Sequence, residues 1–263
     1  MNDVVIATSE ADARAAEAVE QHHAQMAGTL ALRVEALLEA AARQDTAAAR
    51  AAKIELVSWA QQELVPHALA EEKAMYPAAQ SRSEGRLLVD GMLAEHTVIT
   101  DLVAEIASAE EPVRAAASAK ALLVIFESHL GKENELILPL LTAASDVSVA
   151  DLLGGMHELL GGEPHAGAHQ EAEAGHNCTC GEEDGAGYPE LDCRPVPHAI
   201  RHATIFGALD AVRPGGGMIL VASHDPLPLL AQIEQRQPGT FEVDYLERGP
   251  EAWRLTFVRR TAA

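Results

Sequence analysis

The sequence predicts two domains of different class: an up-and-down, antiparallel four-helix bundle, then a small two-layer α/β sandwich. Hydrophobic residues make up 48% of the 263 residues and aromatic residues only 3%, so Ala and Leu carry the apolar content, which favours packed helices. Apolar residues recur at helical spacing through about the first 160 residues, whereas short apolar runs typical of buried strands follow residue 190. A chain of this length also exceeds what one small core needs.

Charge divides the chain at the same places. Residues 1–160 hold 11 basic and 25 acidic residues, residues 161–190 hold no basic and seven acidic residues, and residues 191–263 hold eight of each. The middle stretch is rich in Gly, Glu and His and poor in branched apolar residues, so it cannot bury enough surface to fold alone. We therefore expect domains at 1–160 and 191–263 that fold independently, joined by a mobile acidic linker at 161–190.

Several classes of protein are disfavoured by composition. The formal net charge of -21 argues against a nucleic-acid-binding surface, which needs clustered Lys and Arg. No apolar run approaches the roughly 18 residues of a membrane span, and the first residues lack the basic and apolar regions of a signal peptide. Three Cys residues do not make a disulfide framework. The expectation is a cytoplasmic protein with no nucleic-acid or membrane partner; its oligomeric state stays open.

Four long helical patterns account for the first domain. They span about residues 9–42, 46–79, 85–109 and 112–141, and their short connections imply antiparallel neighbours. Pro66 lies inside the second pattern and predicts a kink about one turn before the residues of interest. A short fifth helix near residues 149–160 is expected to close one end of the bundle.

Histidines interrupt the apolar face of each helical pattern. They are His23, His67, His96 and His129, and two of them have a Glu one turn later, at Glu71 and Glu133. Residues four apart share a helix face. One His on an apolar face is usually a core residue, but six buried polar groups would each cost several kcal/mol without partners. With no inward Lys or Arg to pair the carboxylates, metal ions are the expected partners.

The ligand set points to two ions and not one. Four imidazoles and two carboxylates suit iron, manganese or zinc, and the lack of thiolates argues against a structural zinc site. Six ligands of this kind are too many for one ion and about right for two, bridged by Glu71 and Glu133.

Four segments resemble the hemerythrin-like, or HHE cation-binding, family. They are HHAQM, WAQQELVPHALAEEKAMYP, MLAEHTVIT and SHLGKENELILPLL, in the family's order across about residues 10–145. The resemblance implies a non-haem di-iron site in a bundle core, with ligands at His23, His67, Glu71, His96, His129 and Glu133. Of the adjacent pair His22 and His23, the second shares the face of Leu30 and Leu37 and is the expected ligand.

One position departs from the oxygen-carrying members of that family. They have a second His one turn after the helix-three ligand, where this chain has Thr100. The difference implies an open coordination position, which argues against pure reversible O2 carriage and favours redox reaction, NO binding or sensing. Glu72 is expected to be solvated or to lie beside a ligand, and Tyr76 to pack at the helix end.

The C-terminal segment predicts strand–helix–strand–helix–strand–strand order. Strands are expected around 191–194, 218–222, 241–247 and 253–258, with helices at 198–212 and 226–238, the second capped by Asp225. The runs LDCRPVPHAIRHATIF, SHDPLPLL and YLERGPEAWRL resemble the DUF2249 family, related in fold to the sulfur carrier TusA. Such carriers use Cys-Pro-x-Pro, whereas here Arg194 precedes the prolines and Cys193, expected to be half-buried, lies one place earlier. Direct sulfur transfer is therefore disfavoured, and the domain is expected to serve as a platform for a protein partner or a substrate.

A second metal site is suggested by two further pairs of residues. Cys178 and Cys180 in the linker, with His198 and His202 on the following helix, would make a Cys2His2 zinc site. The alternative is a redox-sensitive Cys pair beside a partly solvated helix start.

Two function classes follow. In the first, the protein is a di-iron protein that binds or reacts with O2 or NO and is redox-active, which with turnover would make it an oxidoreductase. In the second, it senses or stores iron, O2 or NO without turnover. A bundle whose metal is structural is the remaining alternative, and the sequence names no substrate.

Overall fold

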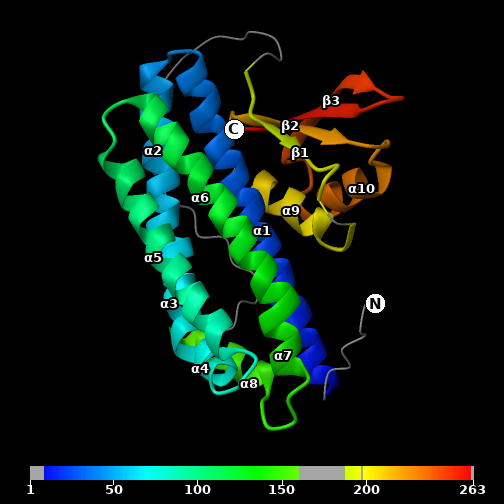
Figure 1. The fold of residues 1–263 in the computed structure, drawn as a ribbon. Helices are drawn as coiled ribbons and strands as arrows, with labels where there is room; N and C mark the ends of the chain where they lie inside the picture. Colours follow the sequence, from blue (N-terminus) through cyan, green and yellow to red (C-terminus); the bar gives the residue numbers. More distant parts are fainter. Residues whose placement is uncertain (1–8, 160–186, 197, 262–263) are drawn as a thin grey trace.

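The computed structural model describes residues 9–159, 187–196 and 198–261 (Figure 1). It shows a helical N-terminal part and a small mixed four-stranded sheet at the C-terminus. None of the described helices is long and apolar enough to cross a membrane. The linker predicted at 161–190 lies almost wholly outside the described residues.

The helical part follows the predicted boundaries closely. Its elements are α1 (Glu10–Ala42), α2 (Thr46–Trp59), η1 (Ala60–Leu64), α3 (Val65–Ala74), α4 (Tyr76–Gln80), α5 (Arg86–Ser108), α6 (Pro112–Lys132), η2 (Glu133–Ile137), α7 (Leu138–Thr142) and α8 (Val149–Leu159). Ser9 caps α1 because its hydroxyl accepts a hydrogen bond from the Asp12 amide. The helix α1 packs against α2 and α6, and α5 packs against the same two helices. A core containing Leu30, Ile99 and Leu122 fills the space between them.

The segments η1 and η2 are single π-helical turns, and each lies just before a proline. Proline has no N–H and its ring clashes with the carbonyl four residues back, so an α-helix cannot pass through it undisturbed. Here the amide before each proline bonds five residues back instead, Val65 to Ala60 and Leu138 to Glu133. The kink expected near Pro66 therefore takes the form of a π turn, and Pro139 repeats the arrangement in the fourth helical segment. Both turns adjoin the predicted ligands.

The C-terminal part has the predicted order of elements. They are β1 (Glu190–Asp192), α9 (His198–Ala211), β2 (Gly217–Ala222), α10 (Leu227–Arg236), β3 (Phe241–Arg248) and β4 (Trp253–Arg259). The strand order is β1-β2-β4-β3, with β1 parallel to β2 and the other pairs antiparallel. The central strand β2 is buried throughout and shares a core with α9 and α10. The predicted cap of α10 is wrong: the Asp225 carboxylate accepts a hydrogen bond from the Tyr245 hydroxyl at 2.8 Å, and the cap position is Pro226.

The C-terminal part packs on α1 through two glycines. Figure 1 shows α9 beside α1, with the sheet on the side of α9 away from the other long helices. A Cβ atom at Gly28 would lie 2.0 Å from the Thr204 carbonyl oxygen, and one at Gly207 would lie 2.1 Å from that of Gln25. The Thr29 hydroxyl also donates to the Gly207 carbonyl oxygen at 2.9 Å. The two backbones can approach this closely only because both positions lack a side chain.

Candidate metal centre

All six predicted ligands lie together inside the helical part. They are His23 on α1, His67 and Glu71 on α3, His96 on α5, His129 on α6 and Glu133 at the first position of η2, each no more than 4% exposed. Two groups of three could each hold an ion, since their ligand atoms lie within 4.8 Å of one another: His23, His67 and Glu71 in one, and Glu71, His96 and His129 in the other. Glu71 belongs to both.

The two carboxylates connect the groups. One oxygen of Glu71 lies 2.9 Å from Nε2 of His67 and 3.3 Å from Nε2 of His23, and its other oxygen lies 3.6 Å from Nε2 of His96. Likewise, Glu133 places one oxygen 3.7 Å from Nε2 of His23 and the other 3.6 Å from Nε2 of His129. Each carboxylate therefore faces both halves of the cluster, as a bridging ligand must.

Three of the imidazoles have a polar partner on Nδ1, the ring nitrogen that faces away from the cluster. The Nδ1 atom of His23 lies 2.8 Å from the Asn134 side-chain oxygen, and that of His96 lies 2.8 Å from a Glu72 carboxylate oxygen. The Nδ1 atom of His129 lies 3.0 Å from Glu95. A partner on Nδ1 selects the tautomer whose Nε2 carries a lone pair, and it orients that lone pair toward the centre.

Of these supporting residues, only Glu72 was expected, and the structure places it beside a ligand. Asn134 and Glu95 were missed, although each is the direct sequence neighbour of a ligand. Neighbours in a regular helix point about 100° apart, so helical periodicity alone places Asn134 away from the centre. The π turn at Glu133–Ile137 changes that angle.

The cluster fits metal ions because several buried atoms lack hydrogen-bond partners. Among the described residues these atoms include Nε2 of His23 and His67, Oε1 of Glu71 and Oε2 of Glu133, each of which lies 2.9 to 3.7 Å from another of them but forms no hydrogen bond. A buried polar atom without a partner costs about 1–3 kcal/mol. These atoms are lone-pair donors aimed at a shared volume, and no described Lys or Arg pairs with either Glu. Coordination to cations satisfies all of them at once.

The electrostatics favour protons where cations would bind. Burial alone would lower the pKa of His23, but the carboxylates of Glu71 and Glu133 outweigh it and raise the pKa to about 9. The pKa of His129 is raised in the same way, by Glu133 in particular. Although burial opposes it, the nearby imidazoles hold the pKa of Glu71 well below its ordinary value. Metal ions at this centre therefore compete with protons.

Tyr76 is buried at a helix end, as expected, but its hydroxyl also reaches the ligand cluster. Its hydroxyl donates to Oε1 of Glu133 at 2.6 Å, and lies 3.1 Å from Nε2 of His129 and 3.3 Å from Nε2 of His96. Burial and the Glu133 charge raise the pKa of the phenol, so it stays protonated. Helical periodicity does not predict this contact, because α3 ends at Ala74 and Tyr76 begins α4.

Thr100 does not face the centre, contrary to the expectation. It is exposed, and its hydroxyl donates at 2.9 Å to the His96 carbonyl oxygen of its own helix. The buried stripe of α5 passes from His96 through Ile99 and Val103. The side chain that reaches His96 and His129 comes from Tyr76 on another helix.

Three members of the predicted zinc site, Cys178, Cys180 and the side chain of His198, lie outside the described residues. The fourth member, His202, lines a cavity of about 170 Å³ that also touches Cys193 and His224. Cys193 is fully buried, not half-buried, and its thiol donates to the Val221 carbonyl oxygen at 3.0 Å. Burial raises the pKa of this thiol, which lowers its reactivity at neutral pH.

Comparison with known families agrees with this site. Residues 14–141 match the hemerythrin HHE cation binding domain, and residues 190–259 match the uncharacterized conserved protein family DUF2249. No curated protein and no solved structure gives a significant match. The chain therefore contains a segment that matches the hemerythrin HHE domain, followed by one that matches DUF2249. The match to the HHE cation binding domain and the buried His/Glu cluster together indicate metal binding.

Proposed function

We propose that this chain is a non-haem di-iron protein that binds or reacts with O2 or NO and is redox-active. In this proposal an up-and-down antiparallel bundle of hemerythrin type holds two iron ions. The observation that carries it is Glu71, which belongs to two separate groups of three buried ligands. Glu133 faces both groups as well.

The donor set supports iron. Imidazole and carboxylate without thiolate suits iron, manganese or zinc, and the HHE match favours iron among them. His23, His67 and Glu71 would hold one ion, and Glu71, His96 and His129 the other, with Glu133 as a second shared carboxylate. Bound iron supplies the electron exchange and the affinity for diatomic gases that the side chains lack.

The protein residues orient the ligands and hold a proton. Asn134, Glu72 and Glu95 fix three imidazoles through Nδ1, so these rings are preorganised. Tyr76 holds its proton on the phenol oxygen, directed at Glu133, where it can stabilise negative charge that develops on that side. Buried Leu30, Met92 and Ile99 make the surrounding core apolar. An apolar core admits an uncharged diatomic molecule more readily than an ion.

Gas reactivity of the reconstituted full chain tests this proposal. The protein loaded anaerobically with Fe(II) is expected to change its absorption spectrum on exposure to O2 and, separately, to NO. If the reduced, iron-loaded protein is inert to both gases, the proposal fails and the metal is structural. Repeated O2 consumption with added reductant would identify an oxidoreductase, whereas one stoichiometric event would favour sensing or storage.

Sensing without turnover is the second candidate, and the packing of α9 on α1 favours it. The same helix carries His23 and, five residues later, Gly28 at the contact with Thr204. A movement of α1 on ligand binding would reach the DUF2249 domain directly. In this role that domain, which we propose to be a TusA-like two-layer sandwich, would present the signal to a protein partner.

Substitution of Gly28 tests that coupling. The change Gly28→Ala places a methyl group against the α9 backbone and is expected to separate the two domains, detected as faster proteolysis of the chain between them. The matched control is Gly91→Ala, since a Cβ at Gly91 meets nothing within 4 Å. If Gly28→Ala leaves proteolysis unchanged, the contact does not hold the domains together and the sensing candidate loses its support.

A further inference from the structure

We propose that a pocket between the helical part and the C-terminal part binds a small organic monocarboxylate with a compact apolar body. The pocket has a volume of about 380 Å³ and lies where α1 and α2 face the turn after α9. This volume is in the range of small-molecule sites, and such sites occur preferentially between domains. The pocket shares no lining residue with the metal centre, so the proposal does not depend on the metal.

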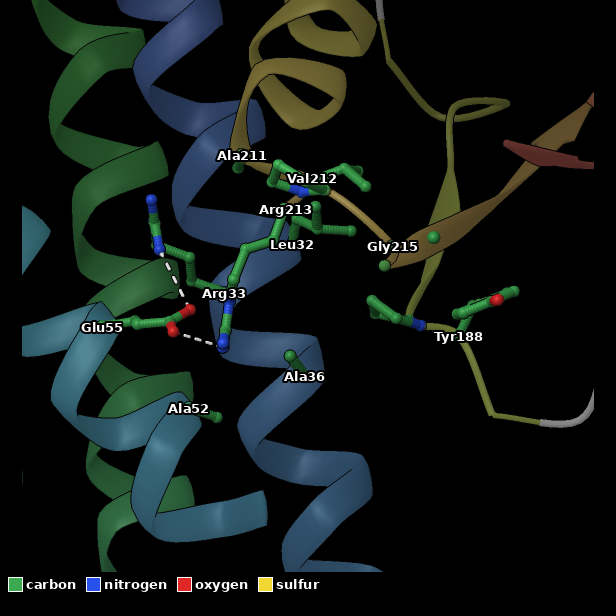
Figure 2. A pocket seen from close by; sticks show the side chains of 14 residues that line it. Leu32, Arg33, Ala36, Ala52, Glu55, Tyr188, Ala211, Val212, Arg213 and Gly215 are labelled. Carbon is green, nitrogen blue, oxygen red and sulfur yellow. Dashed lines mark ion pairs between the residues drawn. The ribbon is translucent and has the colours of Figure 1, made fainter. Parts of the chain in front are cut away.

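Two arginines and one glutamate form the polar wall of the pocket. Figure 2 shows Arg213, from the turn after α9, reaching to Glu55 on α2, with Arg33 of α1 on the other side of that carboxylate. The Arg33–Glu55 distance is 3.8 Å, which is a loose ion pair. Two guanidinium groups beside one carboxylate leave one positive charge in a protein whose net charge is -21.

The guanidinium groups have hydrogen-bonding capacity that Glu55 does not use. Each has five N–H donors, and Nε of Arg33 is buried with no hydrogen-bond partner among the described residues. Burial, and to a lesser extent the charge of Arg213, lowers the pKa of Arg33, so an added anion would stabilise its charged form. A planar carboxylate matches the guanidinium donors in geometry.

The remaining walls favour a carboxylate with an apolar body over phosphate. Leu32, Ala36, Ala52 and Val212 line the pocket, and the two alanines leave room for an apolar group. The amides of the glycine turn are already bonded, Gly215 to the Arg259 carbonyl oxygen and Gly216 to that of Arg213. These two amides are therefore not free to bind a phosphate. The single excess positive charge also suits a monoanion.

Calorimetric titration of the full chain with three probes tests the proposal. Benzoate carries both the carboxylate and the apolar body, benzamide has the same shape without charge, and inorganic phosphate has the charge without the apolar body. Benzoate is expected to bind saturably, with benzamide and phosphate at least about tenfold weaker. No benzoate binding, equal binding of benzoate and benzamide, or preference for phosphate would each overturn the proposal.

Variants locate the binding. Arg33→Gln is expected to weaken benzoate binding about tenfold, whereas Arg114→Gln, an exposed arginine outside the pocket, is expected to leave it unchanged. Ala52→Leu keeps all the charges but fills the apolar wall, and it is expected to abolish binding while far-ultraviolet circular dichroism stays as in the parent. Unchanged benzoate affinity in both Arg33→Gln and Ala52→Leu would place the ligand elsewhere and overturn the assignment.

Discussion

The two His-x-x-x-Glu segments have the same motif but build different halves of the metal centre. In α3, which follows a π turn, Nε2 of His67 lies 2.9 Å from a carboxylate oxygen of Glu71. The Nδ1 atom of His67 has no hydrogen-bond partner among the described residues. In the second segment the π turn begins at Glu133 itself, and a carboxylate oxygen of Glu133 lies 3.6 Å from Nε2 of His129. The same spacing thus yields a direct His–Glu contact in one half and a separated pair in the other.

Contacts from Tyr76 and Glu95 distinguish the half of the metal centre that contains His129 and Glu133. The Tyr76 hydroxyl lies between His129 and Glu133, and Glu95 fixes the rear of the His129 ring. Lys132 pairs with Glu95 and supports it. The first half is therefore the one with fewer supporting contacts, and the second holds a proton donor. A short motif predicts which side chains converge, but the surroundings determine what each half does.

The largest expected effect is on metal content, and it differs between substitution of Glu71 and substitution of Glu133. Glu71 belongs to both ligand groups, so Glu71→Ala should remove both ions and lower the free energy of unfolding by about 3 kcal/mol, because buried His23 loses the nearer of its two charge partners. Glu133→Ala should retain at least one ion, because neither group of three ligands contains Glu133. Metal analysis and chemical denaturation measure both effects, with exposed Glu63→Ala as the control.

Two outcomes would contradict this ranking. Full metal occupancy in the Glu71→Ala, Glu133→Ala double variant would show that neither carboxylate is needed. Equal losses in the two single variants would show that Glu71 has no special position, and the asymmetry would then have no functional consequence.

The next effect is the pH dependence of metal binding. The pKa of His23 is raised from 6.5 to about 9, so the metal-free protein holds a proton there at neutral pH, and this proton must leave when an ion binds. Apparent affinity for Co(II) should therefore rise with pH between 6.5 and about 9, by up to about tenfold per pH unit, and level off above that range. The exposed His22→Ala variant should follow the same curve. A flat profile would mean that His23 is not a ligand.

The same shifts predict the stability of the metal-free protein. Because the pKa of His23 is raised in the folded state, its stabilising contribution is complete below pH 6.5 and is lost as pH rises through about 9. The pKa of Glu71 is lowered, so its contribution is present above pH 4.5 and is lost as pH falls further. Denaturation of the metal-free chain across this range measures both limits.

The smallest expected effect is that of Tyr76→Phe, which alters only the half of the metal centre that contains His129 and Glu133. Tyr76→Phe removes the hydroxyl that donates to Glu133 and should lower the free energy of unfolding by about 1.5 kcal/mol while both ions remain bound. Spectroscopic change should be confined to one of the two irons. Tyr245→Phe, which removes a hydrogen bond to Asp225 in the other domain, should leave the iron spectrum unchanged. An identical iron spectrum in both variants would remove Tyr76 from the centre.

The features that could be predicted are those that depend on local periodicity. Helix boundaries and the inward His and Glu residues follow from apolar residues three and four apart, and the choice of His23 over His22 agrees with their burial. The contacts that Tyr76 and Asn134 make with the ligands were missed because a helix break and a π turn alter the angle between successive side chains. Thr100 was misplaced because the buried stripe of α5 continues through the residue before it.

The contact between the helical part and the C-terminal part could not be predicted for a different reason. Gly28 and Gly207 lie in the middle of helical patterns, where a glycine indicates no more than a low helix propensity. Their role becomes visible once α1 and α9 lie backbone to backbone. The same holds for the pocket, because Arg33, Glu55 and Arg213 come from three separate segments that meet only in the folded chain.

The most direct test of the central claim is Mössbauer spectroscopy of the anaerobic full chain reconstituted with ⁵⁷Fe(II), combined with iron and protein quantification. The account predicts two irons per chain in two distinguishable environments, one on the His67 side and one beside Tyr76. One iron per chain, or two irons bound outside the cluster and unaffected by Glu71→Ala, would contradict it.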